Sequence, residues 1–259
     1  MAYLKGIHTY VGGIFVSFSL LAGVTNAEVY LNAVGKINKA LSFGQSKVIM
    51  ENIYRDIERS FYCGCRLDLP QIIGKGCNAV QELGGQQGMI PLEYEHVLPA
   101  SVFKEALIKN METLVFNAKC VSRSRRCMKM AETSFSILEG DLHNIRPVIG
   151  KLNRLRGNKQ AYPIENELHR SGCGFKLNKK YFEPPDNVKG DIARIHLYMD
   201  YKYASLDLIS KRQKKIYHHW HKIDPPSQIE RKINKRIKVL QGDSNIFIDE
   251  RMDDVLSDK

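Results

Sequence analysis

The sequence predicts an α+β fold that is mainly helical and crosslinked by disulfide bonds. In several segments apolar residues recur every three or four positions, as they do along the buried face of a helix. Two short segments, residues 92–97 and 142–146, are instead typical of brief strands. The chain also contains six cysteines, and an even number favours disulfides if the protein is exported.

The overall composition is that of an ordinary globular protein. Of 259 residues, 43% are hydrophobic and 26% are charged. These values exclude intrinsic disorder, collagen-like repeats and a polytopic membrane protein. There are 39 Lys and Arg against 28 Asp and Glu, so the formal net charge is +11. This excess predicts a polyanionic partner, either nucleic acid or an anionic membrane surface, and says nothing of the fold.

The first 27 residues have the pattern of a secretory signal. Lys5 and His8 precede an apolar stretch over residues 11–24, and small or polar residues ending at Ala27 follow it. The stretch is short and interrupted by Gly and Ser, so an uncleaved membrane anchor is the weaker alternative. Removing residues 1–27 takes away one lysine and no acid, and the mature chain therefore keeps its positive charge.

All six cysteines follow this signal, and they favour disulfides over a zinc site. Cys63 and Cys65 have one residue between them, where zinc modules usually have two to four, and no His pair follows at finger spacing. We therefore expect an oxidising compartment, which means the periplasm or the cell exterior.

Helices are expected on both sides of the two strands. Ser46 is the candidate N-cap of a first helix in which Ile49, Ile53 and Ile57 recur every four residues. The elements expected after it, in chain order, are Cys-rich and Gly-rich loops at 61–88, a strand at 92–97 limited by Pro99, a helix at 101–110, a basic loop at 117–129, a strand at 142–146, and helices at 189–203, 207–222 and 231–240.

A short helix is expected directly after the second strand. Pro147 is placed to begin it, because a proline needs no N–H partner at the first helical position. Leu152 and Leu155 are expected to face the core, while Asn153 and Arg156 share another face.

The chain shows no internal repeat and no linker. We therefore expect one domain over residues 28–242. Residues 243–259 are rich in acids and are expected to form a flexible tail.

Three stretches combine imidazole, carboxylate, carboxamide and guanidinium groups. They are EYEHVLPA at residues 93–100, DLHNIRP at residues 141–147 and GKLNRLRGN at residues 150–158. Taken alone they are only a set of polar groups, since a histidine on a half-buried strand is more often structural than catalytic. Together with FYCGC at 61–65 and GDIAR at 190–194, however, they resemble the bacterial endonuclease I family. Its members are exported nucleases that cut DNA, and often RNA, with little sequence preference.

This resemblance covers about residues 61–203, with a weaker continuation to Gly242, and it implies a catalytic centre. The small core is then a ββα-metal nuclease site, with His96 as general base and Glu95 as metal ligand. Asn153, the first Asn of the family's Gly-x-x-Asn-x-x-Arg-x-Asn helix, becomes the second ligand. Carboxylate and amide oxygens are hard ligands suited to Mg²⁺. The implied reaction is in-line attack on phosphorus by a water that His96 deprotonates.

The same resemblance implies an arginine that assists at the phosphate. Arg125, in the basic loop, is the candidate and Arg126 the substitute, and Arg156 is expected to bind phosphate as well. The expected supporting residues are His143, Asn144 and Asn158.

One geometric requirement accompanies these roles. Adjacent residues of a regular strand point to opposite faces. Glu95 and His96 can therefore serve one phosphate only if the strand ends or distorts there, which the nearby Pro99 favours.

Six thiols leave the disulfide connectivity open. We expect the pairs Cys120 with Cys127, which are close in sequence, Cys65 with Cys77, and Cys63 with Cys173.

The sequence thus predicts a secreted or periplasmic, Mg²⁺-dependent endonuclease without sequence specificity. Its expected substrate is DNA, with RNA as a second candidate, and we expect a monomer that is not inserted in a membrane after signal removal. The alternative is a noncatalytic cationic protein that binds nucleic acid on a degenerate nuclease scaffold. A nuclease used as an effector against another cell would share the same chemistry.

Overall fold

The computed structural model describes residues 41–73, 77, 89–116 and 125–249, with the backbone alone at 71, 73, 89, 111–116 and 125–131. Its helices are α2 (Phe43–Ile53), α4 (Ala100–Phe116), α5 (Arg125–Glu139), α6 (Gly150–Arg156), α7 (Lys189–Lys202), α8 (Lys211–Ile223), α9 (Gln228–Gln241) and α10 (Ile246–Asp249), with 3₁₀ turns η1 (Leu142–Asn144), η2 (Asp186–Val188) and η3 (Ala204–Leu206). Its strands are β1 (Leu67–Asp68), β2 (Gln71–Ile73), β3 (Met89–His96), β4 (Ile145–Ile149), β5 (Gln160–Ala161), β6 (His169–Arg170), β7 (Lys176–Leu177) and β8 (Tyr181–Glu183). The predicted signal at residues 1–27 lies outside the described residues.

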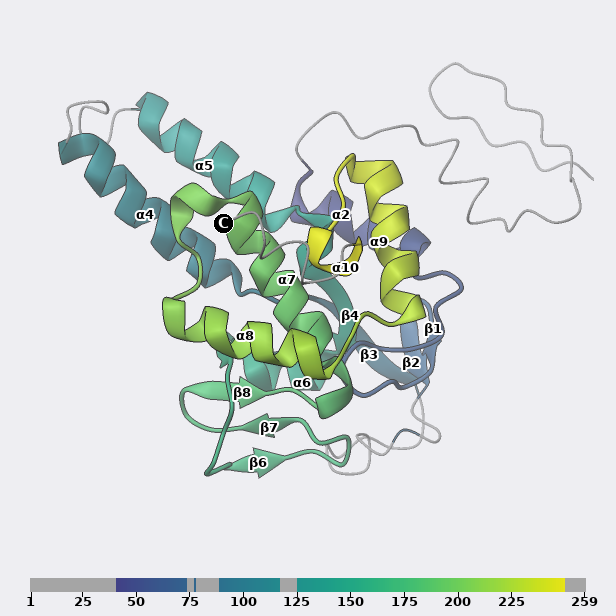
Figure 1. Ribbon diagram of the computed structural model, residues 1–259. Helices are drawn as coiled ribbons and strands as arrows, with labels where there is room; N and C mark the ends of the chain where they lie inside the picture. The colour runs from purple at the N-terminus through teal and green to yellow at the C-terminus, as the bar shows by residue number, and fades with distance from the viewer. Residues whose placement is uncertain (1–40, 74–76, 78–88, 117–124, 250–259) are drawn as a thin grey trace, which may run out of the picture.

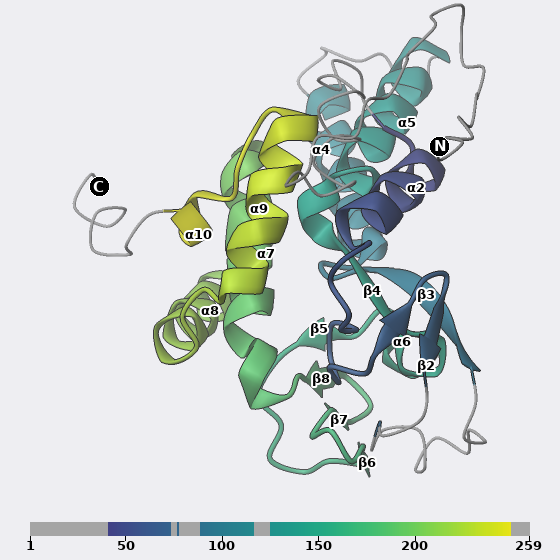
Figure 2. The same cartoon turned by 90° about the vertical axis from the view of Figure 1, so that its right-hand side faces the viewer.

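Two small sheets and a majority of helix confirm the predicted α+β class. One sheet has the order β1-β2-β3-β4 and the other β5-β8-β7-β6. α7 lies between α8 and the first sheet, while α4 and α5 run side by side at one end of the molecule (Figures 1 and 2). No helix among the described residues has the length and apolar character needed to cross a membrane.

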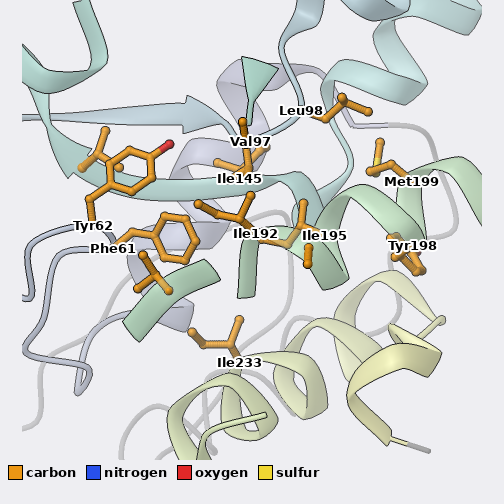
Figure 3. Packing of buried hydrophobic residues seen from close by; sticks show 14 of the residues in the cluster. Phe61, Tyr62, Val97, Leu98, Ile145, Ile192, Ile195, Tyr198, Met199 and Ile233 are labelled. Atoms are coloured by element: carbon orange, nitrogen blue, oxygen red, sulfur yellow. The ribbon is translucent and has the colours of Figure 1, made fainter. Parts of the chain in front are cut away.

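The core lies where α7 packs against the ends of β3 and β4. Ile192 and Ile195 of α7 are fully buried and face Ile145 of β4 and Val97, the residue after β3 (Figure 3). Ile233 of α9 covers α7 from the other side (Figure 3). The apolar periodicity that predicted a helix at 189–203 therefore corresponds to the buried face of α7 in the core.

β3, β4 and the short helix α6 form a ββα unit, although α4 and α5 lie between the two strands in sequence. β3 and β4 are antiparallel and place Glu95 opposite Arg146 and His96 opposite Ile145. All five residues of β4 are buried, and α6 begins directly after it. The chain therefore turns from β4 into a helix that packs back on β3.

The prediction that Pro147 begins a helix was wrong. Pro147 lies within β4, opposite Tyr94, and α6 begins at Gly150. β4 is the edge strand of its sheet, where a residue without an N–H is tolerated. Leu152 is fully buried as predicted, but Leu155 is 39% exposed because α6 turns other residues toward the strands.

The cap of the first helix was also placed wrongly. Ser42 caps α2, since its side chain accepts from the Gln45 N–H and the Gln45 side chain accepts from the Ser42 N–H. Ser46 is buried and its Oγ donates to the Gly140 carbonyl at 2.7 Å. Its hydroxyl therefore joins α2 to the rest of the domain instead of capping a helix.

The predicted basic loop at 117–129 is wrong for its last five residues, and residues 117–124 lie outside the described residues. α4 continues to Phe116 and α5 begins at Arg125, so residues 125–129 are helical. The charged side chains that suggested a loop are compatible with a helix, because Arg and Lys are good helix formers.

The predicted flexible tail is packed over its first residues. Asn245 is fully buried. Its N–H donates to Asn234 Oδ1 of α9, and its carbonyl accepts from Asn234 Nδ2. Phe247 and Ile248 of α10 are buried as well. The domain therefore extends at least to Asp249, and residues 250–259 lie outside the described residues.

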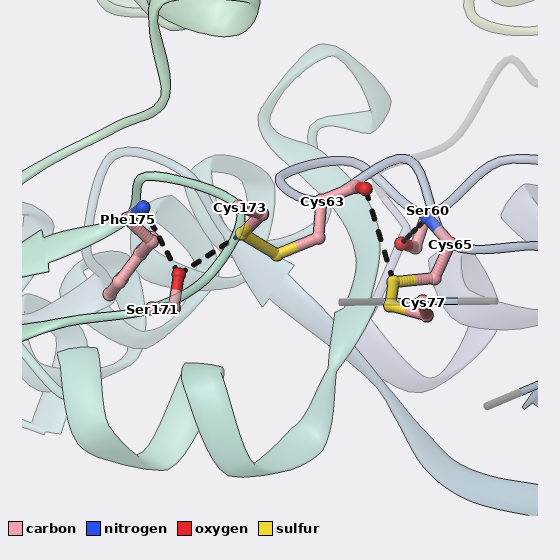
Figure 4. The surroundings of a disulfide bond; sticks show 7 residues. All are labelled: Ser60, Cys63, Cys65, Cys77, Ser171, Cys173 and Phe175. Carbon is pink, nitrogen blue, oxygen red and sulfur yellow. Dashed lines mark hydrogen bonds between the residues drawn. A yellow bond between two sulfur atoms is a disulfide. The ribbon is translucent and has the colours of Figure 1, made fainter. Parts of the chain in front are cut away.

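Two of the three expected disulfides are present. Cys63 pairs with Cys173, and Cys65 pairs with Cys77 (Figure 4). The first links the segment before β3 to the second sheet, with Ser171 Oγ 3.1 Å from the Cys173 sulfur. The pair of Cys120 with Cys127 stays a prediction, because Cys120 lies outside the described residues.

Removing the long-range disulfide is expected to destabilise the protein more than removing the short-range one. The Cys63–Cys173 bond spans 110 residues, which corresponds to about 5 kcal/mol of unfolding free energy from loop closure. The Cys65–Cys77 bond spans 12 residues and corresponds to about 3 kcal/mol. Denaturant unfolding of the two Cys→Ser double variants under nonreducing conditions measures both values. Equal losses in the two variants would contradict this expectation.

Candidate active site

Three residues of α6 and β3 meet at the first turn of α6. Alternation along β3 places Glu93 and Glu95 on the face that α6 covers. Asn153 Nδ2 donates to Glu93 Oε2 at 2.8 Å, and Arg154 forms an ion pair with the same carboxylate. A Cβ at Gly150 would lie 2.8 Å from Glu93 Oε1, so the absence of a side chain there permits this close approach.

Glu93 is a site residue that the sequence reasoning missed. It stands two positions before Glu95, and the period of two along a strand was the signal that both carboxylates share a face. Its contact fixes the orientation of the Asn153 amide: a carboxylate only accepts, so Nδ2 faces Glu93 and Oδ1 is left as an acceptor.

Glu95 forms a buried ion pair with Arg156, one turn farther along α6. Glu95 Oε1 lies 2.6 Å from Arg156 Nη1, and each side chain is 2% exposed or less. Burial raises the pKa of Glu95, and the positive charge of Arg156 opposes that rise. Glu95 Oε2 is buried and accepts no hydrogen bond of normal geometry from the described residues. The Tyr62 hydroxyl is nevertheless close enough to the Glu95 carboxylate to help lower its pKa.

The Arg156 guanidinium also holds the end of β3. It donates to the carbonyls of His96 at 2.8 Å and Val97 at 2.5 Å, and its Nε donates to the Lys159 carbonyl at 2.9 Å. The structure thus joins Arg156 to both Glu95 and the His96 backbone, but does not place it at the surface. Its expected contact with phosphate stays a prediction.

The His96 side chain points to the other side of the strand. Its Nε2 lies 2.8 Å from the Glu139 carbonyl, which can only accept, so Nε2 carries the hydrogen and Nδ1 is the free acceptor. The Phe43 ring of α2 packs on the imidazole, with ring centres 4.2 Å apart. Burial is the main reason that the pKa of His96 is lowered to about 4. His96 is therefore neutral at pH 7, as a general base must be.

The chain turns sharply after His96, and Asn144 holds this turn. β3 ends at His96, and Val97 donates to the Asn144 carbonyl at 2.9 Å. The Asn144 side chain accepts from the Leu98 N–H at 2.7 Å and donates to the Leu98 carbonyl at 2.9 Å. β3 ends directly after His96, but Glu95 and His96 are both paired residues of the strand and point to opposite sides of it. The distortion that would bring both side chains to one phosphate is therefore not seen, and their joint action stays a prediction.

His143 is not brought to this site. It is buried against Tyr198, with ring centres 4.4 Å apart, and its Nε2 lies 3.2 Å from the Asp243 carbonyl. Asp141 accepts from the His143 N–H and pairs with Lys202, which closes a separate polar cluster.

No contact among the described residues joins the remaining expected residues to the site. Asn158 is exposed two residues after α6. Arg125 and Arg126 form the first turn of α5, whose backbone alone is described there. Their expected roles stay predictions.

The donor set fits a hard divalent cation. Glu95 supplies a buried carboxylate oxygen without a hydrogen-bond donor, and Asn153 supplies an amide oxygen oriented by Glu93. Within the described residues no group of three or more His, Cys, Asp or Glu could hold a metal. Mg²⁺ needs no such group, since it is commonly bound by one or two protein oxygens and keeps several waters.

Comparison with known proteins supports the expected resemblance. The family model for endonuclease I matches residues 61–252. The chain is 30% identical to Endonuclease-1 of Buchnera aphidicola from Acyrthosiphon pisum, over 80% of each chain. It is 29% identical to an extracellular deoxyribonuclease of Aeromonas hydrophila, over 82% of this chain and 91% of that one. It is also 30% identical to a periplasmic deoxyribonuclease of A. hydrophila, over 82% and 87%.

The two A. hydrophila relatives are named extracellular and periplasmic, which confirms the predicted secreted or periplasmic location. The family match spans β3, β4 and α6, the elements that carry Glu95, His96 and Asn153. The chain therefore belongs to the endonuclease I family of nucleases.

Proposed function

We propose that the protein is a Mg²⁺-dependent, sequence-nonspecific endonuclease that hydrolyses the phosphodiester bonds of DNA outside the cytoplasm. The relatives named deoxyribonucleases support DNA as substrate. RNA is the second candidate, because the chain is 31% identical, over 42% of its length, to an extracellular ribonuclease of Bacillus subtilis. The observation that carries the proposal is a neutral His96 oriented by the Glu139 carbonyl, next in sequence to Glu95, whose buried carboxylate has an oxygen without a normal hydrogen bond.

His96 is the general base of this proposal. The Glu139 carbonyl holds Nε2–H and leaves Nδ1 to accept a proton from the attacking water. The same carbonyl stabilises the imidazolium that forms, because its dipole points its negative end at Nε2–H. The Phe43 ring restricts the imidazole to this orientation.

Glu95 and Asn153 are the residues that would hold Mg²⁺. When bound, the ion supplies positive charge to the phosphate and to the leaving 3′ oxygen. Glu93 keeps the Asn153 amide oxygen free for that purpose by accepting from Nδ2. Arg125 is the proposed arginine at the phosphate and Arg126 its substitute, and the family resemblance is what supports these two roles.

Cleavage of supercoiled plasmid and of a structured RNA by the oxidised mature protein tests this function. We expect Mg²⁺-dependent nicking of the plasmid that EDTA abolishes. Asn153→Ala should raise the Mg²⁺ concentration needed for half-maximal rate on the order of tenfold or more, because it removes a ligand oxygen. Leu155→Ala, which shortens an exposed side chain of the same helix, is the matched control and should leave the metal requirement near that of the wild type.

The noncatalytic alternative makes a different prediction. Salt-sensitive binding of DNA without cleavage under any metal condition would favour it and would exclude the nuclease function.

A further inference from the structure

A cleft of about 630 Å³ opens between α2 and the site. Phe43 and Lys47 of α2 form part of one wall, and Glu93, Tyr94 and Asn153 form part of the other. β2 pairs only with residues 89–91 of β3, so the edge of β3 beside Glu93 and Tyr94 is left open to the cleft. The expected metal ligand Asn153 therefore lines the cleft opposite α2. The family model matches residues 61–252, so the α2 residues of this cleft lie outside the matched part of the chain.

α2 is fixed in this place by the segment that orients His96. Ser46 donates to the Gly140 carbonyl at 2.7 Å within the core. A side chain at Gly140 would collide with the Leu41 carbonyl, so the two segments approach as closely as their backbones permit. Gly140 directly follows Glu139, whose carbonyl holds the imidazole. Helix α2 and the His96 imidazole are thus both held by the backbone of residues 139–140.

The Phe43 ring contacts both the His96 imidazole and the Lys47 ammonium. Its ring packs on the imidazole at 4.2 Å, and Lys47 Nζ lies 5.1 Å from the centre of the same ring. Lys47 is exposed. Such a stacked ammonium has its stem held by the ring while its charge stays available to a ligand.

The charge of Lys47 is not neutralised by the described part of the chain. No carboxylate there comes within 4.0 Å of its ammonium. Glu93, the carboxylate on the opposite wall, is already engaged by Arg154 and Asn153. Glu51, one turn along α2, also lines the cleft without forming an ion pair with Lys47. An anion entering the cleft therefore meets the Lys47 ammonium on the α2 wall without an ion-pair partner among the described residues, with the Glu51 carboxylate one turn away.

We propose that Lys47 is a substrate-binding residue whose ammonium contacts a backbone phosphate of the DNA strand at the active site. This inference rests on the proposed nuclease function and adds α2 to the substrate-binding surface. A lysine binds phosphate as a point charge and does not read bases, which agrees with cleavage that is independent of sequence.

The test is binding of a fluorescein-labelled DNA duplex in EDTA, measured by fluorescence anisotropy over a range of salt concentrations. Lys47→Gln is expected to weaken binding on the order of fivefold to tenfold near 0.1 M salt, and to reduce the slope of log affinity against log salt by about 0.9, the value for one lost phosphate contact. Lys47→Arg should retain most of the affinity. Lys238→Gln, which removes an exposed cation of α9, is the matched control and should leave the slope unchanged.

Plasmid cleavage by the same variants separates binding from chemistry. Lys47→Gln should raise KM while kcat stays within about twofold of the wild type, because the base and the metal ligands are intact. An unchanged slope and KM in an active Lys47→Gln variant would overturn the inference, as would an equal loss in Lys238→Gln. If the wild type binds DNA and Lys47→Gln lowers the slope, but no metal supports cleavage, the proposed function fails while the phosphate contact stands.

Discussion

Replacing His96 by Ala is expected to lower kcat by about 10²- to 10⁴-fold, the usual contribution of a general base. The reason is geometric: Nε2–H is held by the Glu139 carbonyl, so the substitution removes the one imidazole nitrogen that is free to accept a proton. Initial rates of plasmid nicking at saturating Mg²⁺ measure the loss. His219→Ala, which removes an exposed imidazole of α8, is the matched control and should retain wild-type turnover.

A second measurement distinguishes loss of the base from loss of structure. His96 packs on Phe43 without contributing a buried charge, so His96→Ala should unfold cooperatively and keep the DNA affinity of the wild type. Added imidazole should restore part of the rate, since it can occupy the space left by the side chain. Wild-type turnover in a correctly folded His96→Ala variant would show that another group is the base.

The sequence predicted most of the helices and the central strands, because their apolar spacing depends on local pattern alone. Leu152 was correctly placed in the core of α6 by that spacing. Pro147 was misplaced because a proline is acceptable both at a helix start and in an edge strand, and only the order of strands in the sheet distinguishes the two. Ser46 failed similarly: a serine that could cap a helix instead reaches Gly140, which is 94 residues away.

The site was predictable in its residues and not in their contacts. The motifs indicated Glu95, His96 and Asn153, and the structure places all three on the ββα unit. The motifs could not show that Phe43 of α2 covers His96, or that the Glu139 carbonyl selects its tautomer. Such contacts join segments distant in sequence, and no local pattern encodes them.

Replacing Arg156 by Met is expected to lower the unfolding free energy by about 3 to 5 kcal/mol, the cost of leaving a buried charge without its partner. The substitution keeps an unbranched apolar stem but is shorter than Arg. It leaves Glu95 in the core without its partner and removes the donor to the His96 and Val97 carbonyls. Urea unfolding measures the loss. Arg154→Met is the matched control on the same helix and should cost at most about 1 kcal/mol, because that arginine is 61% exposed.

The double variant Arg156→Met with Glu95→Gln separates a structural arginine from one that binds phosphate. Neutralising Glu95 removes the uncompensated charge, so the double variant should recover much of the stability lost in Arg156→Met. It should still lack Mg²⁺-dependent cleavage, because the expected carboxylate ligand is gone. If Arg156 instead acts mainly on substrate, Arg156→Met will raise KM with an unchanged unfolding free energy, and Glu95→Gln will rescue nothing. The first outcome would mean that the ion pair which secures the fold at the end of β3 also holds the metal ligand in place.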